Sequence, residues 1–465
     1  MMELTNKSVL VLGLGETGLS LARWLVAQGA RVRAADSRKL PPAFATLRME
    51  LPQVEIHCGA FCDEIFSNVD LIAISPGVPL ADPFVARAVA RGIPVVGDIE
   101  LFAQQLVAND PKLTTKVIAI TGANGKTTVT SMVGAMCRAA GLDTAVAGNI
   151  SPAALDALLQ RGERQPDVWV LELSSFQLET TTSLNADAAT VLNVSEDHLD
   201  RYADMDAYAA AKARIFQGTG VQVLNRDDAR SLGMGLPGRR HATFGLNEPL
   251  DANDWGVERS GGDTWLTQGQ QCVLNANELQ VAGLHNVANA LAALALCRAI
   301  GLPLRPLLDA LRTFKGLPHR VEPVSEINGV IYYDDSKGTN VGATVAALQG
   351  LERVAVLIAG GDGKGQDFTP LHPVVAQHAR AVVLIGRDAD RIAAALENCG
   401  VPVVHASDMA DAVRQSAALA LPGDAVLLSP ACASFDMFRN YTHRAEVFIG
   451  AVHEQQGEAA CASQA

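Results

Sequence analysis

Short apolar runs rich in Val, Ile and Leu alternate with amphipathic stretches along almost the whole chain. Runs such as Val168–Leu173 have the length of a buried strand, whereas Gly18–Gln28 has the pattern of an amphipathic helix. Strands that alternate with helices favour parallel sheets covered by helices on both faces. The pattern therefore predicts an α/β fold.

The alternation falls into three blocks. The polar segments Val107–Thr115 and Gly316–His319 separate them and are predicted to be linkers. Within the second block, His241–Val281 is rich in turn residues and predicts a small antiparallel insert. The three predicted domains are residues 1–112, 113–317 and 318–465. The strands expected in them are Ser8–Leu14, Arg31–Asp36, Asp70–Ser75, Ile93–Val96, Val117–Thr121, Val168–Leu173, Ala188–Val194, Val221–Asn225, Val330–Tyr333, Arg353–Ala359, Ala381–Ile385, Pro402–His405 and Ala425–Ser429.

Composition narrows the functional classes. The chain has 465 residues, of which 49% are hydrophobic and 19% charged, which is enough apolar material for several cores. Its net charge of -13 argues against a nucleic-acid-binding protein, which needs a basic face. The apolar N-terminal stretch is too short for a signal peptide, and no run is long enough to span a membrane. With scattered cysteines, these features predict a cytoplasmic protein without membrane insertion.

The motif with the most specific chemistry is IAITGANGKTT, at Ile118–Thr128. Glycines follow its buried strand, and their N–H groups, with the N-terminus of the next helix, can bind phosphate. Lys126 can reach the terminal phosphates of a nucleotide, and the hydroxyl of Thr127 is placed to bind magnesium. Ile120 stands where the common phosphate-loop motif has its first glycine, so this loop is a tighter variant. The alternative, an ordinary glycine-rich turn, does not explain the GKTT ending.

From this loop onward the chain resembles the Mur ligase family, the ATP-dependent amide ligases of peptidoglycan synthesis. The segments that carry the resemblance lie in the expected order and are TGANGKTT, LELSSFQLE, NVSEDHLDRY, GLHNVANALAA, GLPHRVE, DDSKGTN, GGDGKGQDF and SPACASFDMF. The last three resemble those of members that add D-glutamate to UDP-N-acetylmuramoyl-L-alanine. The resemblance implies a Rossmann-like UDP-binding domain, a central P-loop-type ATPase domain with a parallel sheet and small antiparallel insert, and a C-terminal Rossmann-like amino-acid-binding domain.

The resemblance also implies a reaction and a catalytic set. The substrates are ATP, D-glutamate and UDP-N-acetylmuramoyl-L-alanine, the intermediate is an acyl phosphate, and the protein is a monomer that closes its domains about two linkers. The implied catalytic residues are Lys126, Glu172, His198, Lys212 and Arg320. Two Mg²⁺ ions would be held by Thr127, Glu172, His198 and a carbamylated Lys212. Taken alone, the sequence favours plain surface residues at His198 and Lys212.

Further binding residues follow from the same resemblance. ATP-binding residues are Gly122, Ala123, Asn124, Gly125, Lys126, Thr127, Thr128, Asn286, Arg320 and Asp335. Residues for the UDP-linked substrate are Gly15, Glu16, Thr17, Asp36, Ser37, Ser75, Pro76, Gly77, Asn149 and Ser174. D-glutamate residues are Lys337, Thr339, Lys364, Ser434 and Tyr441. Asn286 opens the predicted helix Asn286–Ile300, where a helix cap is the alternative.

Three other functions remain as alternatives. GLGETG at Gly13–Gly18, with Asp36 some twenty residues later, also fits an NAD-binding loop of an oxidoreductase. Another amino-acid ligase is the second alternative, either of the Mur type or like folylpolyglutamate synthetase. The latter shares the second and third blocks but lacks the first. A nucleotide-sensing regulator without catalysis is the third alternative.

Overall fold

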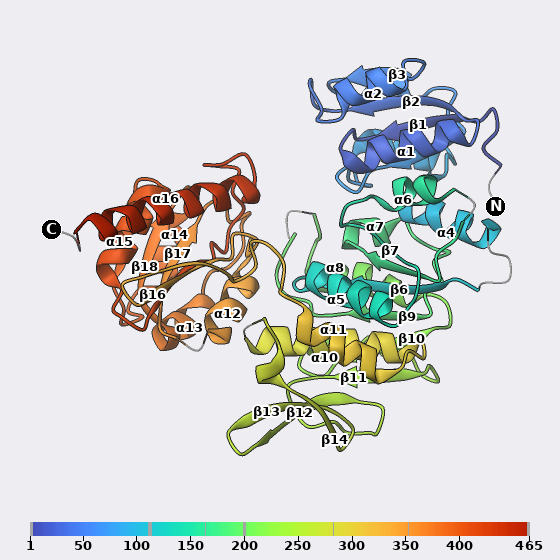
Figure 1. Cartoon of the computed structure of the whole chain (residues 1–465). Coiled ribbons are helices and arrows are strands. Elements are labelled where there is room, and N and C mark those ends of the chain that lie inside the picture. The colour runs from blue at the N-terminus through green and yellow to red at the C-terminus, as the bar shows by residue number, and fades with distance from the viewer. Residues whose placement is uncertain are drawn as a thin grey trace.

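The structure is a computed structural model that describes residues 3–109, 114–162, 164–198, 201–281, 283–351 and 353–462. It contains three sheets with helices packed around them, as Figure 1 shows. The predicted boundary between residues 112 and 113 lies outside the described residues. None of the described helices combines the length and apolar character that a membrane crossing requires.

The first sheet is parallel, with the strand order β3-β2-β1-β4-β5. Its strands are β1 (Ser8–Leu12), β2 (Arg31–Asp36), β3 (Glu55–Cys58), β4 (Leu71–Ile74) and β5 (Val95–Val96), and its helices are α1 (Glu16–Ala27), α2 (Phe44–Glu50) and α3 (Pro83–Ala90). The four predicted strands are present; β2 has the predicted bounds, and β1, β4 and β5 are shorter than predicted. β3 was not predicted, because the four-residue sequence EIHC has neither an apolar run nor a clear alternation.

Helix α4 (Asp98–Asn109) connects the first sheet to the second and packs on the second. The ring of Phe102 meets that of Trp169 on β8 edge-on, with 5.0 Å between centroids. The Glu100 carboxylate accepts hydrogen bonds from the backbone N–H groups of Thr182 and Ser183, at 2.7 and 2.9 Å. We propose on these contacts that α4 belongs with the central domain.

The central sheet has nine strands in the order β14-β13-β12-β11-β10-β9-β6-β8-β7. They are β6 (Lys116–Thr121), β7 (Thr144–Gly148), β8 (Val168–Glu172), β9 (Ala188–Val191), β10 (Val221–Asn225), β11 (His241–Phe244), β12 (Trp255–Ser260), β13 (Asp263–Gln268) and β14 (Gln271–Asn275). The predicted antiparallel part is confirmed in β12–β14, which extends this sheet at one edge. The helices are α5 (Lys126–Ala139), α6 (Ala154–Arg161), α7 (Ser175–Glu179), α8 (Met205–Ala213), α9 (Ala229–Leu232), α10 (Leu284–Ala299) and α11 (Leu304–Thr313).

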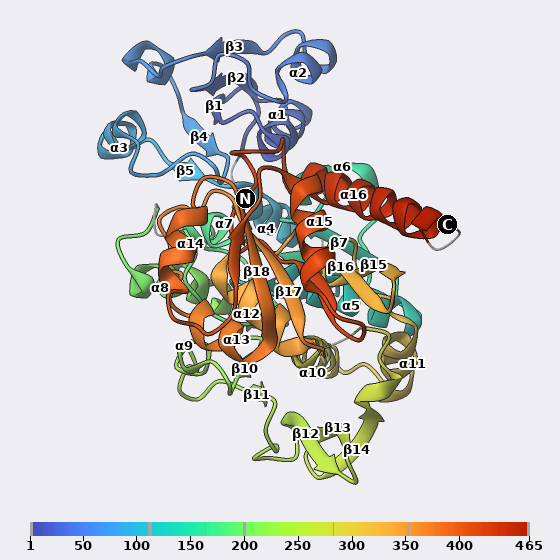
Figure 2. The ribbon, with the colours of Figure 1, turned by 90° about the vertical axis from the view of Figure 1, so that its left-hand side faces the viewer.

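The third sheet has the order β15-β16-β20-β17-β18-β19, and only its edge strand β15 runs antiparallel. Its strands are β15 (Glu322–Ile327), β16 (Val330–Asp334), β17 (Ala355–Gly360), β18 (Ala379–Ile385), β19 (Val403–His405) and β20 (Ala425–Leu428). Its helices are α12 (Val341–Gly350), α13 (Leu371–His378), α14 (Ala389–Ala395), α15 (Met409–Leu419) and α16 (Tyr441–Ala462). Figure 2 looks onto this domain, with α16 lying across it.

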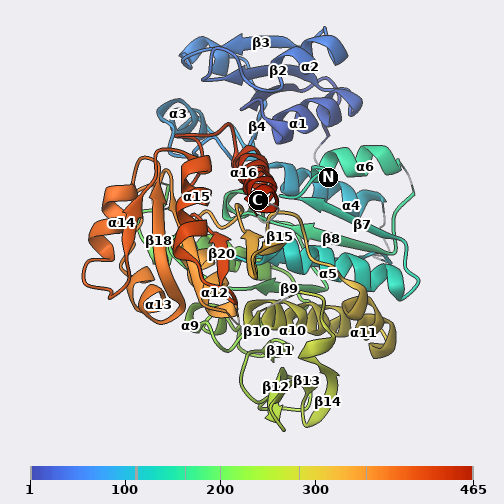
Figure 3. The same cartoon turned by 60° about the vertical axis from the view of Figure 1, so that its left-hand side comes forward.

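Parallel sheets collect ligands outside the carboxyl ends of their strands. The loops after β6, β8 and β9 form one such edge in the central sheet, and the loops after β16, β17 and β20 form another in the third domain. Figure 3 shows the third domain, which includes β15 and β20, beside the central sheet and its helices. Hydrogen bonds between Asn124 and Asn340 confirm that the two edges meet.

Candidate active site

The phosphate loop lies between β6 and α5. Gly125 caps α5 in the left-handed region (φ +81°), and a Cβ there would come within 2.6 Å of Asn289 Oδ1. Glycine is therefore required both by the backbone and by the space. Lys126 Nζ donates hydrogen bonds to the carbonyls of Gly122 and Ala123, at 2.8 and 2.9 Å, so its ammonium lies over the loop.

Lys212 lies on α8 and is 1% exposed, which overturns the surface reading of this residue. Its Nζ donates to the Gly122 carbonyl at 2.9 Å and lies 4.4 Å from the centroid of the Tyr208 ring. Burial, aided by repulsion from Lys126, drives the pKa of Lys212 well below its ordinary value. A neutral amine is what reaction with carbon dioxide requires, so the environment fits the expected carbamate.

Glu172 ends β8 and is buried. Its Oε1 accepts a hydrogen bond from Asn149 Nδ2 at 2.8 Å. Its Oε2 is also buried, and among the residues that the structure describes no group hydrogen-bonds it. A carboxylate oxygen left in this state is costly unless a cation meets it. Glu172 therefore fits the magnesium ligand that the sequence predicts.

His198 lies in the loop after β9, in the left-handed region (φ +58°). Its ring packs against Phe176, with 4.7 Å between centroids, and its Nε2 is 3.6 Å from Asp197 Oδ2. Burial lowers the pKa of His198, which favours the neutral imidazole that can bind a metal. Thr127 is half-buried in the first turn of α5. Hydroxyl, carboxylate and carbamate oxygens suit Mg²⁺, so the predicted donor set is chemically consistent.

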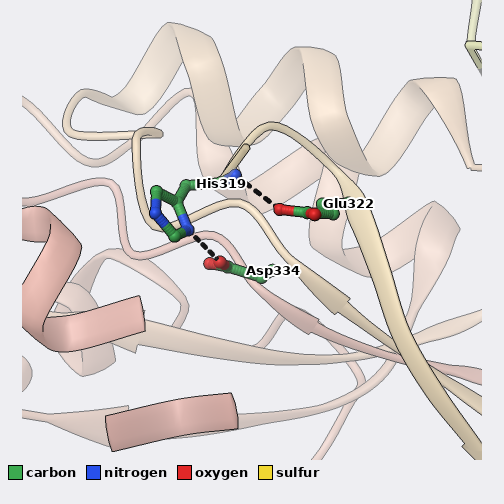
Figure 4. A group of neighbouring side chains, drawn as sticks. All are labelled: His319, Glu322 and Asp334. Carbon is green, nitrogen blue, oxygen red and sulfur yellow. Dashed lines mark hydrogen bonds and ion pairs between the residues drawn. The ribbon is translucent and has the colours of Figure 1, made fainter. Parts of the chain in front are cut away.

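Arg320 lies between His319 and Val321 in the linker to the third domain. Figure 4 shows His319 beside Glu322 and Asp334. The imidazole Nδ1 of His319 lies 2.6 Å from Asp334 Oδ2, and the His319 N–H donates to Glu322 Oε2 at 2.9 Å. His319 and Val321 both have left-handed backbones (φ +63° and +48°). This conformation is uncommon outside glycine and is rare for a β-branched residue such as Val321. A strained backbone of this kind persists only where contacts enforce it, so the backbone on either side of Arg320 is held in one conformation.

A cavity of about 300 Å³ lies between the phosphate loop and the third domain. The predicted ATP or D-glutamate residues that line it are Asn124, Gly125, Thr128, Asn286, Arg320, Asp335 and Lys337. Gly122, Ala123, Lys126 and Thr127 belong to the same loop but not to this lining. Asn286 lies in the first turn of α10, whose N-cap is Gly283, so the helix-cap alternative for Asn286 is wrong.

The charged groups around this cavity have pKa values that burial shifts away from their ordinary values. Burial lowers the pKa of Lys126 and of Arg320, although nearby carboxylates, Glu172 among them, oppose the change. Burial raises the pKa of Asp335 to about 7, although Ser429 Oγ donates a hydrogen bond to its Oδ2 at 2.7 Å. Several cations held in such surroundings favour an anionic ligand.

The predicted D-glutamate residues lie in loops at the carboxyl edge of the third sheet or at the start of α16. Lys337 Nζ lies 3.9 Å from the centroid of the Tyr441 ring, and burial lowers its pKa. Thr339 follows in the same loop. Lys364 points to the central domain, with its Nζ 4.0 Å from Asp197 Oδ1. Ser434 is buried in the loop before α16.

The cavity of about 300 Å³ beside the phosphate loop is called here the second cavity, and the first cavity, of about 480 Å³, lies at the carboxyl edge of the first sheet. Nine of the ten residues predicted for the UDP-linked substrate line it: Gly15, Glu16, Thr17, Asp36, Ser37, Ser75, Pro76, Gly77 and Asn149. Ser174 is not part of this lining, and its side chain caps α7. Although burial opposes it, hydrogen bonds from Arg38 and from the Leu14 N–H lower the pKa of Asp36. Asp36 thus ties the loop after β1 to the loop after β2.

Sequence reasoning missed several residues of these cavities. Arg38 and Gln177 line the first cavity, and Asn193, Ser195 and Asn289 line the second. Asn193 follows a buried strand, so the strand-end argument used for Glu172 could have identified it. The others carry no such signal.

The chain matches three models of one family. The Mur ligase MurD-like N-terminal domain matches residues 7–97, the Mur ligase middle domain matches 120–297, and the Mur ligase glutamate ligase domain matches 319–432. A protein from Nitrosospira multiformis named UDP-N-acetylmuramoylalanine–D-glutamate ligase is 60% identical to this chain over 459 residues. The match covers 98% of this chain and 97% of that protein. The relative of the same name from Thiobacillus denitrificans is 59% identical over 464 residues, covering 97% of each.

Solved structures agree with this assignment at the level of fold. UDP-N-acetylmuramate-alanine ligase MurC from Thermotoga maritima has a TM-score of 0.60 at 20% identity and covers 96% of this chain and 99% of that one. MurF from Acinetobacter baumannii has a TM-score of 0.60 at 18% identity, with 96% and 91% covered. Matched over all three of its domains, the chain belongs to the Mur ligase family.

Proposed function

We propose that this protein is an ATP-dependent ligase that joins D-glutamate to UDP-N-acetylmuramoyl-L-alanine, yielding ADP and phosphate, in peptidoglycan precursor synthesis. Relatives that bear the name of this activity are close to 60% identical along nearly the full chain. The structural observation that carries the proposal is the cavity shared by the phosphate loop and by Arg320, Asp335 and Lys337 of the linker and third domain. Such a cavity can bring a nucleotide and an amino acid together.

In the proposed reaction, the substrate carboxylate attacks the γ-phosphate of ATP, the bond between the γ-phosphorus and the bridging oxygen breaks, and an acyl phosphate and ADP form. The amine of D-glutamate then attacks this carbonyl, and phosphate leaves. Lys126 and Arg320 lower the repulsion between the anions, and positioning by the loop supplies most of the remaining catalysis. Bound Mg²⁺ would further neutralise the phosphate oxygens. Half-buried cations lower this repulsion more strongly than exposed ones, because water screens their charges less.

We further propose two Mg²⁺ sites and a carbamate on Lys212. The buried Glu172 Oε2, which accepts no hydrogen bond from the described residues, and the depressed pKa of the Lys212 amine support both. Incubation with ¹³C-labelled bicarbonate is expected to give a carbamate carbon signal in the NMR spectrum. That signal should be absent in Lys212→Arg and retained in Lys116→Arg, which changes an exposed lysine at the start of β6.

The decisive experiment measures phosphate release with each substrate omitted in turn and across L- and D-amino acids. We expect release to need ATP, the UDP-linked substrate and D-glutamate together. A folylpolyglutamate synthetase-like activity would instead use L-glutamate and a folate. Nucleotide binding without any phosphate release would support a regulator. We propose a cytoplasmic monomer, which gel filtration of the active protein can check.

A further inference from the structure

The phosphate loop is joined directly to the third domain by two asparagines, Asn124 and Asn340, called here the asparagine pair. Asn124 Nδ2 donates to Asn340 Oδ1 at 3.2 Å, and Asn340 Nδ2 donates back to Asn124 Oδ1 at 3.1 Å. Two carboxamides that exchange both hydrogen bonds permit few relative orientations. The contact therefore sets both the distance and the angle between the loop and α12.

All the hydrogen-bonding capacity of the Asn340 side chain is used. Its Oδ1 also accepts from the N–H of Ala343 at 2.9 Å, which makes Asn340 the N-cap of α12. Its second amide hydrogen faces Asp197 Oδ2 at 3.4 Å, and the residue is 4% exposed. Ser or Asp caps a helix about as well as Asn. Neither can exchange both hydrogen bonds with Asn124, so the cap alone does not account for an amide at this position.

Asn124 is itself fixed to the central sheet. Asn193, just beyond β9, accepts from the Asn124 N–H at 2.8 Å and donates to the Asn124 carbonyl at 3.2 Å. The second amide hydrogen of Asn124 faces Ser195 Oγ at 3.3 Å. Because backbone and side chain are both held, the asparagine pair connects two rigid parts of the molecule.

The fit around the asparagine pair is close. A Cβ at Gly342, in the first turn of α12, would lie 3.0 Å from Ser195 Oγ and 3.3 Å from Asn124 Nδ2. The segment just before α12 carries Asp335 and Lys337, which line the shared cavity. Whatever holds the start of α12 therefore also holds these two residues against the nucleotide site.

We propose that Asn340 is a positioning residue: by pairing with Asn124 it holds the third domain against the phosphate loop and so places Asp335 and Lys337 at the reacting groups. The proposal rests on the proposed function, since it concerns the same reaction. Asn340 acts through Asn124 and needs no contact with a substrate. The pair forms only when the two domain edges meet.

The test is Asn340→Ser, which keeps a helix cap and breaks the pair. We expect kcat to fall roughly five- to twenty-fold, as the loss of two buried hydrogen bonds implies. Binding of the UDP-linked substrate, measured by calorimetry, should not change, because its cavity is lined by none of the third-domain residues that the structure describes. Asp408→Ser makes a matched change at the N-cap of α15 and should leave kcat unchanged. A wild-type kcat in Asn340→Ser would overturn the proposal.

A double-mutant cycle separates pairing from independent effects. Once Asn124→Ser has broken the pair, adding Asn340→Ser should lower kcat little further, whereas two losses that multiply would overturn the proposal. Small-angle X-ray scattering gives a readout without catalysis, and Asn340→Ser should have a larger radius of gyration than the wild type. An inactive wild type would count against the proposed function alone, because the scattering difference would still test the asparagine pair.

Discussion

The loop after β1 and the loop after β6 both follow a buried strand, contain a left-handed glycine and lead into a helix, yet they meet different neighbours. The first loop faces Asp36, whose charge is already matched by Arg38. The second faces Lys126, Lys212 and Arg320, all with pKa values lowered by burial. The two loops therefore share their local structure but differ in the charged groups that face them.

The assembly of the two cavities differs as well. The first is lined by one domain and by Asn149 and Gln177 of the next, whereas the second is shared between the central sheet, the linker and the third domain. Cations removed from water are unfavourable until an anion joins them. We conclude that the first loop is suited to binding and that the second is suited to stabilising charge that develops during a reaction.

The largest expected effect comes from Lys126→Ala in the second loop. We expect kcat to fall on the order of 10²–10³-fold, because the half-buried cation of the phosphate loop is lost. Phosphate release at saturating substrates measures it. Lys116→Ala, at the other end of β6, removes only an exposed ion pair with Asp187 and should leave the rate near the wild type. A Lys126→Ala protein with wild-type kcat would remove the distinction between the loops.

The strand ends explain why so much of this site could be predicted from the sequence. Buried runs locate β6 and β8 to within a residue or two, and parallel strands bring their carboxyl ends to one edge. Lys126 and Glu172 follow from this argument. His198 and Lys212 do not, since neither a loop histidine nor a helix lysine has a pattern that reveals burial, and only family resemblance makes them candidates.

Other features depend on packing that no local pattern encodes. The amphipathic pattern of α4 indicates an apolar face but does not specify which sheet it covers. The role of Asn340 arises from a partner 216 positions away, and as a helix cap it looks ordinary in the sequence. Long-range polar contacts of this kind become visible only in the folded chain.

A smaller effect is expected from Thr17→Val in the first loop. Thr17 lines the cavity of the first domain, and loss of its hydroxyl should weaken binding of the UDP-linked substrate roughly 10-fold. The kcat at saturation should stay unchanged, because the reacting groups lie elsewhere. Calorimetry and saturation kinetics measure the two quantities separately. Thr5→Val, exposed before β1, is the control, and a fall in kcat for Thr17→Val would contradict the assignment of binding to this loop.

The variant with no expected effect on activity changes stability behind the first cavity, where Asp98 contacts Gln177, with 2.9 Å between Asp98 Oδ2 and Gln177 Nε2. Burial raises the pKa of Asp98 from 3.8 to about 6. Between these pH values the folded protein keeps a proton that the unfolded chain has released, so this group lowers stability as pH rises through the window. The cost is at most about 3 kcal/mol and is fully present above pH 6.

Asp98→Asn does not titrate, and its carbonyl can still accept from Gln177. We therefore expect the melting temperature of the variant to exceed that of the wild type by several degrees at pH 8, with the difference shrinking toward pH 4.5 and kcat unaffected at either pH. Thermal unfolding of both proteins across this range measures it. Asp98 lies behind the loop that we assign to binding and not behind the loop that we assign to the reaction, so an altered kcat in this variant would show that the first cavity also takes part in the chemistry.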